Sequence, residues 1–470
     1  MVTSTTSSST TRWWRDLIDA ARGTKHDYTQ GTIGRSIFLL AVPMVLEMVM
    51  ESLFAVSDVF FVSRLGAAAV ATVGLTESLM IIVYTLAMGL AISAAAIVAR
   101  RIGEQDPDAA AAATVQAIIL GVIVSGSISL LGAIFAPDLL RLMGADADVL
   151  ATGVPFARVM LGGSCTAFLL FVINAALRGA GDAAVAMRVL TLANIINIVL
   201  GPMLIFGVGP FPELGVVGAA IATTIGRGVG VLFALSRLLR GTGHLAVRAH
   251  HLRLEPATIG RMLSMSRNGT FQVLVGSLNW ILLIRLMSSF GSVAMAGYTI
   301  AIRLVVFALL PAWGLSNAAA TMVGQSLGAS NPDRAEQSVW AAARYNVVFL
   351  GVMGVILFVG ATWIVSAFTA DPAVAEVAVY GLRVIALGFP AFAFGMVLTQ
   401  SFNGAGDTQT PTWINIGVFW FFEIPIAWAL GMHTGMGWRA IFVSVLAAYT
   451  LLAGVSTVFF RRGRWRTRTV

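Results

Sequence analysis

The hydrophobic residues of the chain gather in twelve long runs, and short polar segments separate each run from the next. Each run is long enough for a transmembrane helix, which needs about 20 mostly apolar residues. Turn sequences such as Asp106-Pro107-Asp108 and Asn331-Pro332-Asp333 stand between the runs. The pattern predicts an all-α integral membrane protein with spans at 35–62, 68–100, 110–136, 148–178, 184–208, 215–240, 257–289, 294–327, 336–366, 373–403, 410–432 and 437–460.

The chain also repeats itself at a constant offset of 225 residues. Gly103 recurs as Gly328, and the sequence Gly-Ala-Gly-Asp occurs both at 179–182 and at 404–407. Because each half holds an even number of spans, the two halves share one orientation in the membrane. We therefore expect two six-helix bundles related by a parallel pseudo-two-fold repeat, with a substrate path between them.

Arginine residues collect at alternate connections between the predicted spans, and they set the expected orientation. Arg100 and Arg101 lie at one such connection, and arginines are again frequent after residue 460. Since basic residues favour the cytoplasmic side, we expect both termini in the cytoplasm and the protein in the inner (plasma) membrane. The expected divisions are a tail at 1–32 with an interfacial helix, a first lobe at 33–240, a basic linker at 241–256, a second lobe at 257–460 and a basic tail at 461–470.

The composition supports this class of protein and excludes several others. Charged residues make up 11% of the chain, against about 25% in soluble proteins. The net charge of +8 does not indicate a nucleic-acid partner, because the basic residues lie between apolar runs. The chain has no phosphate-binding loop of the Gly-x4-Gly-Lys-Ser/Thr type, and its histidines show no metal-ligand spacing on a span. We expect a transporter that is not an enzyme and needs no cofactor.

Three acidic residues in the first span are the main candidates for the chemistry. A charged side chain at membrane depth costs about 2.5–3.5 kcal/mol on insertion scales, so each needs a reason. Glu47, Glu51 and Asp58 fall on one helical stripe about 40° wide. One hypothesis is a hydrated cavity in the first lobe that admits a cation. The alternative is that one or two of them are neutral and form hydrogen-bonded pairs between helices.

Polar residues on later spans of the first half could complete such a site. Asn174, Asn197 and Thr223 offer oxygen atoms that can surround a cation beside a carboxylate. They are also ordinary hydrogen-bond partners between membrane helices. We predict that Asp58, Glu51, Glu47, Asn174, Asn197 and Thr223 couple transport to a cation.

The second half differs in its chemistry. Its ionisable residues are scattered, and Arg303 with Glu423 is one possible ion pair. It is rich in aromatic residues, which can line a pocket for flat cationic compounds. We therefore place coupling in the first lobe and part of substrate selection in the second. The candidates for the substrate cavity are Glu77, Gln272, Asn279, Trp313, Gln400 and Asn415.

Several segments together resemble the multidrug and toxic-compound extrusion (MATE) family. They are Ala55-Val56-Ser57-Asp58-Val59-Phe60-Phe61-Val62, Asn174-Ala175-Ala176-Leu177-Arg178-Gly179-Ala180-Gly181-Asp182, Asn197-Ile198-Val199-Leu200-Gly201-Pro202 and Gly218-Ala219-Ala220-Ile221-Ala222-Thr223. The resemblance runs from about residue 33 to 460. It implies two six-helix bundles, alternating access, and exchange of H⁺ or Na⁺ for organic cations and other drugs.

The resemblance also implies residue roles. Asp58 matches the family's cation-coupling acid, and Asn174 and Asn197 match amides near it. This chain departs from the pattern at Gly201, where the family often has Asp four residues after the second Asn. The coupling ion, H⁺ or Na⁺, therefore stays open. The expected partners are a small-molecule substrate and membrane lipids, with the protein as a monomer. The alternative function is a flippase for a lipid-linked sugar or peptidoglycan precursor.

Overall fold

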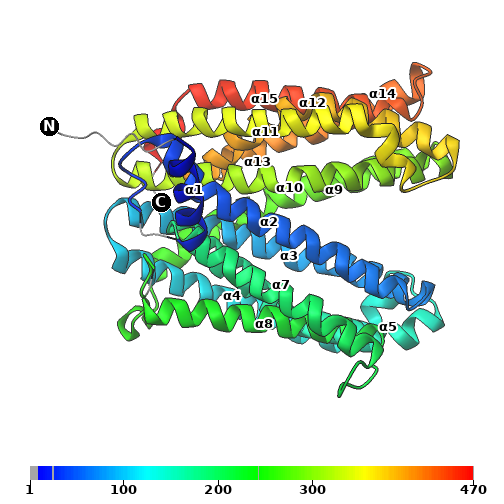
Figure 1. Cartoon of the computed structure of the whole chain (residues 1–470), viewed down its shortest axis with the longest axis horizontal. Coiled ribbons are helices and arrows are strands. Elements are labelled where there is room, and N and C mark those ends of the chain that lie inside the picture. Colours follow the sequence, from blue (N-terminus) through cyan, green and yellow to red (C-terminus); the bar gives the residue numbers. More distant parts are fainter. Residues whose placement is uncertain (1–8, 24–25, 242, 469–470) are drawn as a thin grey trace.

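The computed structural model describes residues 9–23, 26–241 and 243–468, and within these ranges the chain forms helices and no strand. Figure 1 shows two groups of helices side by side. Twelve helical stretches of the described residues are long and apolar enough to cross a membrane. The predicted spans agree with them to within a few residues, except that the third runs on to Leu142. The prediction of twelve spans is confirmed.

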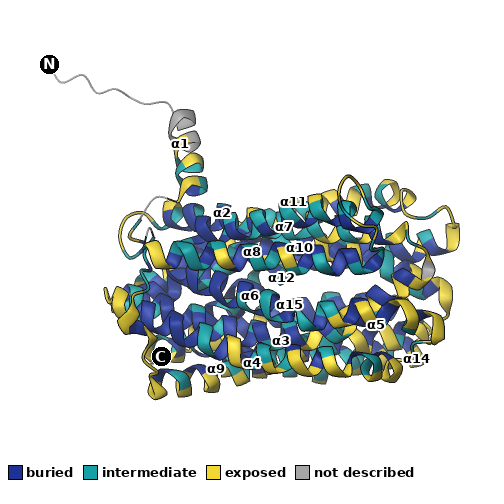
Figure 2. Cartoon of the chain, turned by 90° about the horizontal axis from the view of Figure 1, so that it is seen from below, coloured by how far each residue is buried: buried dark blue, intermediate teal, exposed yellow. Residues whose placement is uncertain are grey.

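The first lobe contains six spans. They are α2 (Ile33–Ser63), α3 (Ala67–Gly103), α4 (Pro107–Leu142), α5 (Ala147–Gly162) with α6 (Ser164–Gly179), α7 (Ala183–Phe206) and α8 (Val216–Arg240). A short helix, α1 (Ser9–Arg22), precedes them and runs across the direction of the spans (Figure 2). Arg35 Nε donates to Asp16 Oδ1 at 2.9 Å and fixes α1 to the start of α2.

The second lobe repeats this order of spans. Its helices are α9 (Pro256–Ser288), α10 (Ser292–Gly328), α11 (Pro332–Ser366), α12 (Pro372–Gly404), α13 (Gln409–Asn415) continued by the π-helical η2 (Ile416–Glu423) and α14 (Ile424–His433), and α15 (Arg439–Arg461). The short helices η1 (Ala249–Leu252) and η3 (Arg464–Thr467) lie in the linker and in the tail.

The turns after α3 and α10 show that the repeat is structural. Asp106 accepts the Ala109 N–H at 2.9 Å and starts α4, with a proline in the first turn. Asn331 accepts the Arg334 N–H at 3.0 Å and starts α11 in the same way. A short polar side chain before proline is a strong signal for a helix start. The two halves therefore fold alike at equivalent positions.

Large apolar side chains cover the outside of the bundle. On α11, Val348, Val352, Val355 and Val359 are each more than half exposed and lie on one helical face. Figure 2 shows such exposed residues along the outer helices, whereas buried residues dominate the interior. An apolar stripe this long faces lipid rather than water.

The two lobes meet at the end of the molecule that carries both termini (Figure 1). Here Gly103 of α3 and Gly328 of α10 pack together, and a Cβ on Gly328 would lie 2.8 Å from the Gly103 Cα. A Cβ on Gly103 would clash with the Gln325 carbonyl oxygen. The pseudo-two-fold axis thus passes between Gly103 and Gly328, which occupy equivalent positions in the repeat. They can lie this close because glycine has no side chain.

Two helices lean across from their own lobe onto the other. The helix α2 packs against α7 and also against α10, and α9 packs against α3. Ser93 Oγ of α3 lies 2.9 Å from Ser266 Oγ of α9. The contacts are in the halves of these helices nearest the termini, and the lobes diverge towards the opposite end (Figure 1).

The Gly-Ala-Gly-Asp turn of each half holds the segment that follows that half. Asp182 Oδ1 lies 2.7 Å from His244 Nδ1, and Asp182 Oδ2 accepts the His244 N–H at 2.8 Å. Asp407, buried at 3% exposure, lies 3.4 Å from Arg468 NH2. The linker and the tail are therefore each anchored to an equivalent acid.

A substitution at the axis tests this packing. Gly103→Ala should destabilise the protein by about 1–3 kcal/mol, because the added methyl group meets backbone that has to move. Gly74→Ala on the same helix is the matched control, since a Cβ there meets no atom within 4 Å. Thermal unfolding in detergent would measure both, and equal stability of the two variants would contradict the axis contact.

Candidate functional site

Glu47 forms a buried ion pair inside the first lobe. Its side chain is 2% exposed, and Arg178 NH1 of α6 donates to its Oε1 at 2.6 Å. Asn174 Nδ2 lies 3.4 Å from the same oxygen. Pairing compensates the charge of a carboxylate that has left water. For Glu47 the structure thus has an ion pair between α2 and α6, which differs both from the hydrated cavity and from a neutral hydrogen-bonded pair.

Glu51 lies one turn further along α2 and meets a second arginine. Asn194 Nδ2 donates to Glu51 Oε2 at 3.3 Å, and Arg227 NH2 of α8 lies 3.9 Å from Oε1. Arg227 NH1 also donates to the Tyr84 hydroxyl at 2.9 Å. Arg227 is not among the site residues predicted from the sequence, although it lies within a predicted span, one helical turn after Thr223.

Asp58 is half-buried and makes no ion pair within 4 Å among the described residues. It interacts electrostatically with Glu77 of α3, which has the same sign, and with Arg227, which has the opposite sign. Glu77 in turn interacts with Arg303 on α10 of the other lobe. Asp58 is therefore the α2 acid whose charge is least compensated, and it lies at one end of a chain of charges between the lobes.

The remaining two coupling candidates bond to each other. Asn197 Nδ2 donates to Thr223 Oγ1 at 2.7 Å. No hydrogen bond in the described part of the chain joins this pair to an acid of α2. A Cβ on Gly201, one turn after Asn197, would meet only the Asn197 Oδ1 at 4.0 Å. The six predicted residues are thus a Glu47–Asn174 contact, an Asn197–Thr223 pair, and the separate acids Glu51 and Asp58, rather than one shell.

The six candidates for a substrate cavity make separate polar contacts. Gln400 binds Asn317 at 3.1 Å and Asn403 at 2.7 Å, near the end of α12. Asn279 binds Glu423, and Glu77 belongs to the first lobe. Within the described ranges, no hydrogen bond joins any two of the six, which also include Gln272, Trp313 and Asn415.

Glu423 is a buried acid of the second lobe, and its partner is not the one considered from the sequence. Asn279 Nδ2 donates to Glu423 Oε2 at 3.0 Å. Arg303 is exposed and interacts with Glu77 instead. The Arg303–Glu423 pairing is therefore wrong, because Asn279 takes the place beside Glu423 and the charge of Arg303 acts on Glu77.

The comparisons with known proteins decide the family. The family model described as MatE matches residues 43–203 and 270–429, one segment in each lobe. The chain belongs to the MATE family. Members of this family are membrane transporters rather than enzymes and need no cofactor, so the chain is a multi-pass membrane transporter of small molecules.

Curated relatives match this MATE protein over most of their length. The probable multidrug resistance protein YoeA of Bacillus subtilis is 26% identical over 89% of this chain and 92% of its own. The FAD transporter of Shewanella oneidensis is 27% identical over 87% and 90%. The probable multidrug resistance protein NorM of Thermotoga maritima is 25% identical over 93% and 94%.

Solved structures share the fold. A multidrug resistance MATE family transporter of the MOP superfamily, solved in an outward-facing conformation, superposes with a TM-score of 0.88. It is 24% identical and covers 94% of this chain and 98% of its own. At that identity the likeness establishes the arrangement of helices and says nothing of substrate.

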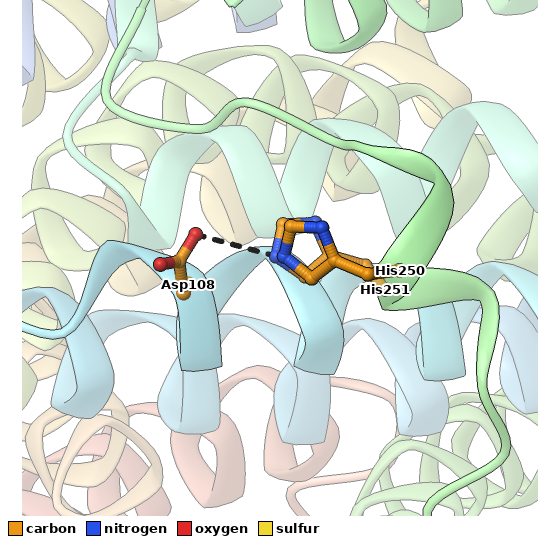
Figure 3. Close-up of side chains that lie close together, drawn as sticks. All are labelled: Asp108, His250 and His251. Carbon is orange, nitrogen blue, oxygen red and sulfur yellow. Dashed lines mark ion pairs between the residues drawn. The ribbon is translucent and has the colours of Figure 1, made fainter.

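A group of two histidines and an aspartate lies outside the spans of this MATE protein (Figure 3). His251 Nε2 is 3.3 Å from Asp108 Oδ1, and the His250 ring lies tilted against the His251 ring with centroids 3.9 Å apart. The Arg248 backbone N–H donates to His251 Nδ1 at 3.0 Å, so the neutral ring carries its proton on Nε2. A metal ion would need that same nitrogen unprotonated. The geometry therefore favours a contact between the linker and α4.

The Glu47–Arg178 pair gives a direct test of the buried charges. Arg178→Met should cost about 3–5 kcal/mol, because it leaves Glu47 buried without a counter-charge. The double variant Glu47→Leu with Arg178→Met should recover most of that loss. Arg141→Met is the control, since its pair with Asp138 is exposed and should contribute about 0–1 kcal/mol. Denaturation in detergent measures all three variants, and an additive double variant would contradict the pairing.

Proposed function

We propose that the chain is a secondary active antiporter that exports small organic compounds, chiefly cations, in exchange for H⁺ or Na⁺. In this proposal both termini face the cytoplasm, the two lobes alternate access to a path between them, and the protein acts as a monomer. The family membership supports export, and relatives named as multidrug resistance proteins support the substrate class. The observation that carries the proposal is Asp58, an acid at membrane depth that has no ion-pair partner within 4 Å among the described residues.

A proton on Asp58 would change the forces on α2. Taking a proton from the outside water forms an O–H bond on the Asp58 carboxyl and removes its negative charge. The repulsion from Glu77 and the attraction to Arg227 then both disappear. Because α2 packs against α10 of the other lobe, a shift of α2 acts on the interface between the lobes. Release of the proton to the cytoplasm would reverse the shift.

The observed arrangement fits one state of this cycle. The lobes are in contact near the termini and diverge at the other end. With the termini in the cytoplasm, that arrangement is outward-facing, as is the similar transporter structure. The path between the lobes would then be open to the outside, where protons enter and the exported compound leaves.

A second candidate function is export of an anionic compound. Arg303 is exposed on α10 and is a positive group of the second lobe near the first. The relative from Shewanella oneidensis is named an FAD transporter, and FAD carries a negatively charged pyrophosphate. The negative charges of Asp58 and Glu77 on the same path favour the cation, and transport assays with both kinds of compound distinguish the two.

Asp58→Asn tests the coupling. In proteoliposomes with an imposed ion gradient, the variant should export the dye ethidium about 5- to 150-fold more slowly, the range of a coupling free energy of about 1–3 kcal/mol. Asp138→Asn removes an exposed acid of the same lobe and should leave export unchanged. Full gradient-driven export by Asp58→Asn would refute this role, and wild-type export of FAD without ethidium export would favour the second candidate.

Arg227 supports a proton as the coupling ion. Its guanidinium stands 3.9 Å from Glu51 and acts on Asp58, in the region where a metal cation would have to bind. A fixed positive charge repels a second cation at close range but leaves a carboxylate free to take a proton. Gly201 offers no carboxylate beside Asn197, so the Asn197–Thr223 pair has no acid next to it that could hold Na⁺.

Arg227→Gln should therefore let Na⁺ act on transport. An imposed Na⁺ gradient should drive dye export at least about tenfold faster than in the wild type, since removal of a charge about 4 Å away is worth several kcal/mol. Arg141→Gln, which removes an exposed arginine of the same lobe, serves as the control. If the wild-type protein already responds to Na⁺ alone, Arg227 does not exclude that ion.

A further inference from the structure

The second lobe contains a buried carboxyl group that the coupling chemistry of the first lobe leaves unexplained. Glu423 is 1% exposed and lies in the middle of the span made by α13, η2 and α14. Its hydrogen bond from Asn279 is neutral, and no arginine, lysine or histidine of the described chain pairs with it. A carboxylate in such a place needs either a proton or a counter-charge.

The surroundings of Glu423 contain polar atoms without partners. Tyr298 of α10 and Tyr449 of α15 both interact electrostatically with Glu423. Their hydroxyl groups, 1% and 3% exposed as residues, make no hydrogen bond in the described structure. The Oδ1 of Asn279, which is 4% exposed, is also without a partner. Three neighbouring spans thus bring unused polar atoms to one carboxyl group, where buried polar atoms normally have partners.

The wall around these groups is aromatic and dry. Tyr449 packs against Phe392 with ring centroids 4.1 Å apart, and Tyr298 packs against Phe442 at 5.8 Å. The charged residues on the same helices are exposed: Arg285 on α9, Arg303 on α10, His433 on α14, and Arg439 and Arg461 on α15. Arg439 pairs with Glu376 at 3.0 Å. The groups that act on Glu423 are therefore the two tyrosines and the Asn279 amide.

The backbone at Glu423 is distorted as well. The segment Ile416–Glu423 is a π-helix, and Pro425 follows it in the first turn of α14. Proline supplies no N–H to the preceding turn, which disturbs the regular helix there. π-helical turns are rare and often occur at functional sites, because they can change register without unfolding. Glu423 thus sits at a point where its helix can rearrange.

We propose that Glu423 is a second proton-carrying site of the transporter, separate from the acids of α2. In the arrangement seen here the carboxyl group holds its proton in a dry pocket. When Glu423 gives up that proton, the Tyr298 and Tyr449 hydroxyls turn towards the carboxylate and donate to it, beside the Asn279 amide that already does so. The bond broken is the Glu423 O–H bond, and the proton passes to water on the cytoplasmic side. Reloading takes a proton from the outside water.

This inference rests on the proposed antiport, but it has a test that does not require transport. Infrared difference spectra of the purified full-length protein, recorded between acid and alkaline pH, should contain a protonated-carboxyl band that is missing in Glu423→Gln. The band should persist in the surface control Glu376→Gln and return, shifted, in Glu423→Asp. Tyr449→Phe should move the pH at which the band disappears, because it removes a hydrogen-bond donor to the charged form. A band unaffected by Glu423→Gln would overturn the proposal.

Transport then separates this site from the first lobe. In proteoliposomes with a pH gradient and an internal pH dye, Glu423→Gln should still bind ethidium, but the protons moved per exported dye molecule should fall by about one. An unchanged proton count would overturn the role of Glu423 in transport. If the wild type exports nothing under any gradient, the antiport proposal fails. The infrared spectra then still decide whether Glu423 carries a proton. If Glu423→Gln fails to fold, Glu423→Asp and Tyr449→Phe decide the question in the same two assays.

Discussion

A membrane tolerates a charged side chain only where something inside the protein balances it, and this requirement organises the interior of the chain. Glu47 has Arg178 at 2.6 Å, Glu51 has Arg227 at 3.9 Å, and Asp58 interacts with Arg227 without pairing with it. Compensation therefore weakens along α2 from the end near the termini towards the opposite end. A fully paired acid is suited to holding helices together, whereas a weakly compensated one is suited to changing its charge.

The position of α2 allows a change of charge on its weakly compensated acid to act on the interface between the lobes. The helix packs against α7 in its own lobe and against α10 in the other. Its strongest ion pair lies in the half that also touches α10, where Gly314 of α10 packs against Met44. The weakly compensated Asp58 lies in the half where the lobes diverge. One end of the helix is thus fixed in the interface, and the other end is free to respond to a change of charge.

Much of this architecture follows from the sequence because it depends on length and spacing. The spans could be predicted from runs of apolar residues. The repeat could be predicted from glycines such as Gly103 and Gly328. Both halves have glycine at this position because the close contact between the two residues leaves no space for a side chain. The stripe of acids on α2 could be predicted from helical geometry. The partners of those acids could not, because Arg178 and Arg227 are far away along the chain and meet α2 only through helix packing. The surroundings of Glu423 were missed for the same reason, since four separate spans supply them.

The contacts of the tail that follows the second lobe determine where the chain can be tagged or shortened. Asp407 is buried at 3% exposure, and Arg468, two residues before the last position of the sequence, is its cationic partner. Arg468 also offers its carbonyl oxygen to Arg100 NH2 at 2.7 Å, so this short tail joins the second lobe to the first. The tail thus connects the two lobes through Arg468. A purification tag should be added after residue 470, because a variant that ends at the last spanning helix would lose the contacts of Arg468 with both lobes.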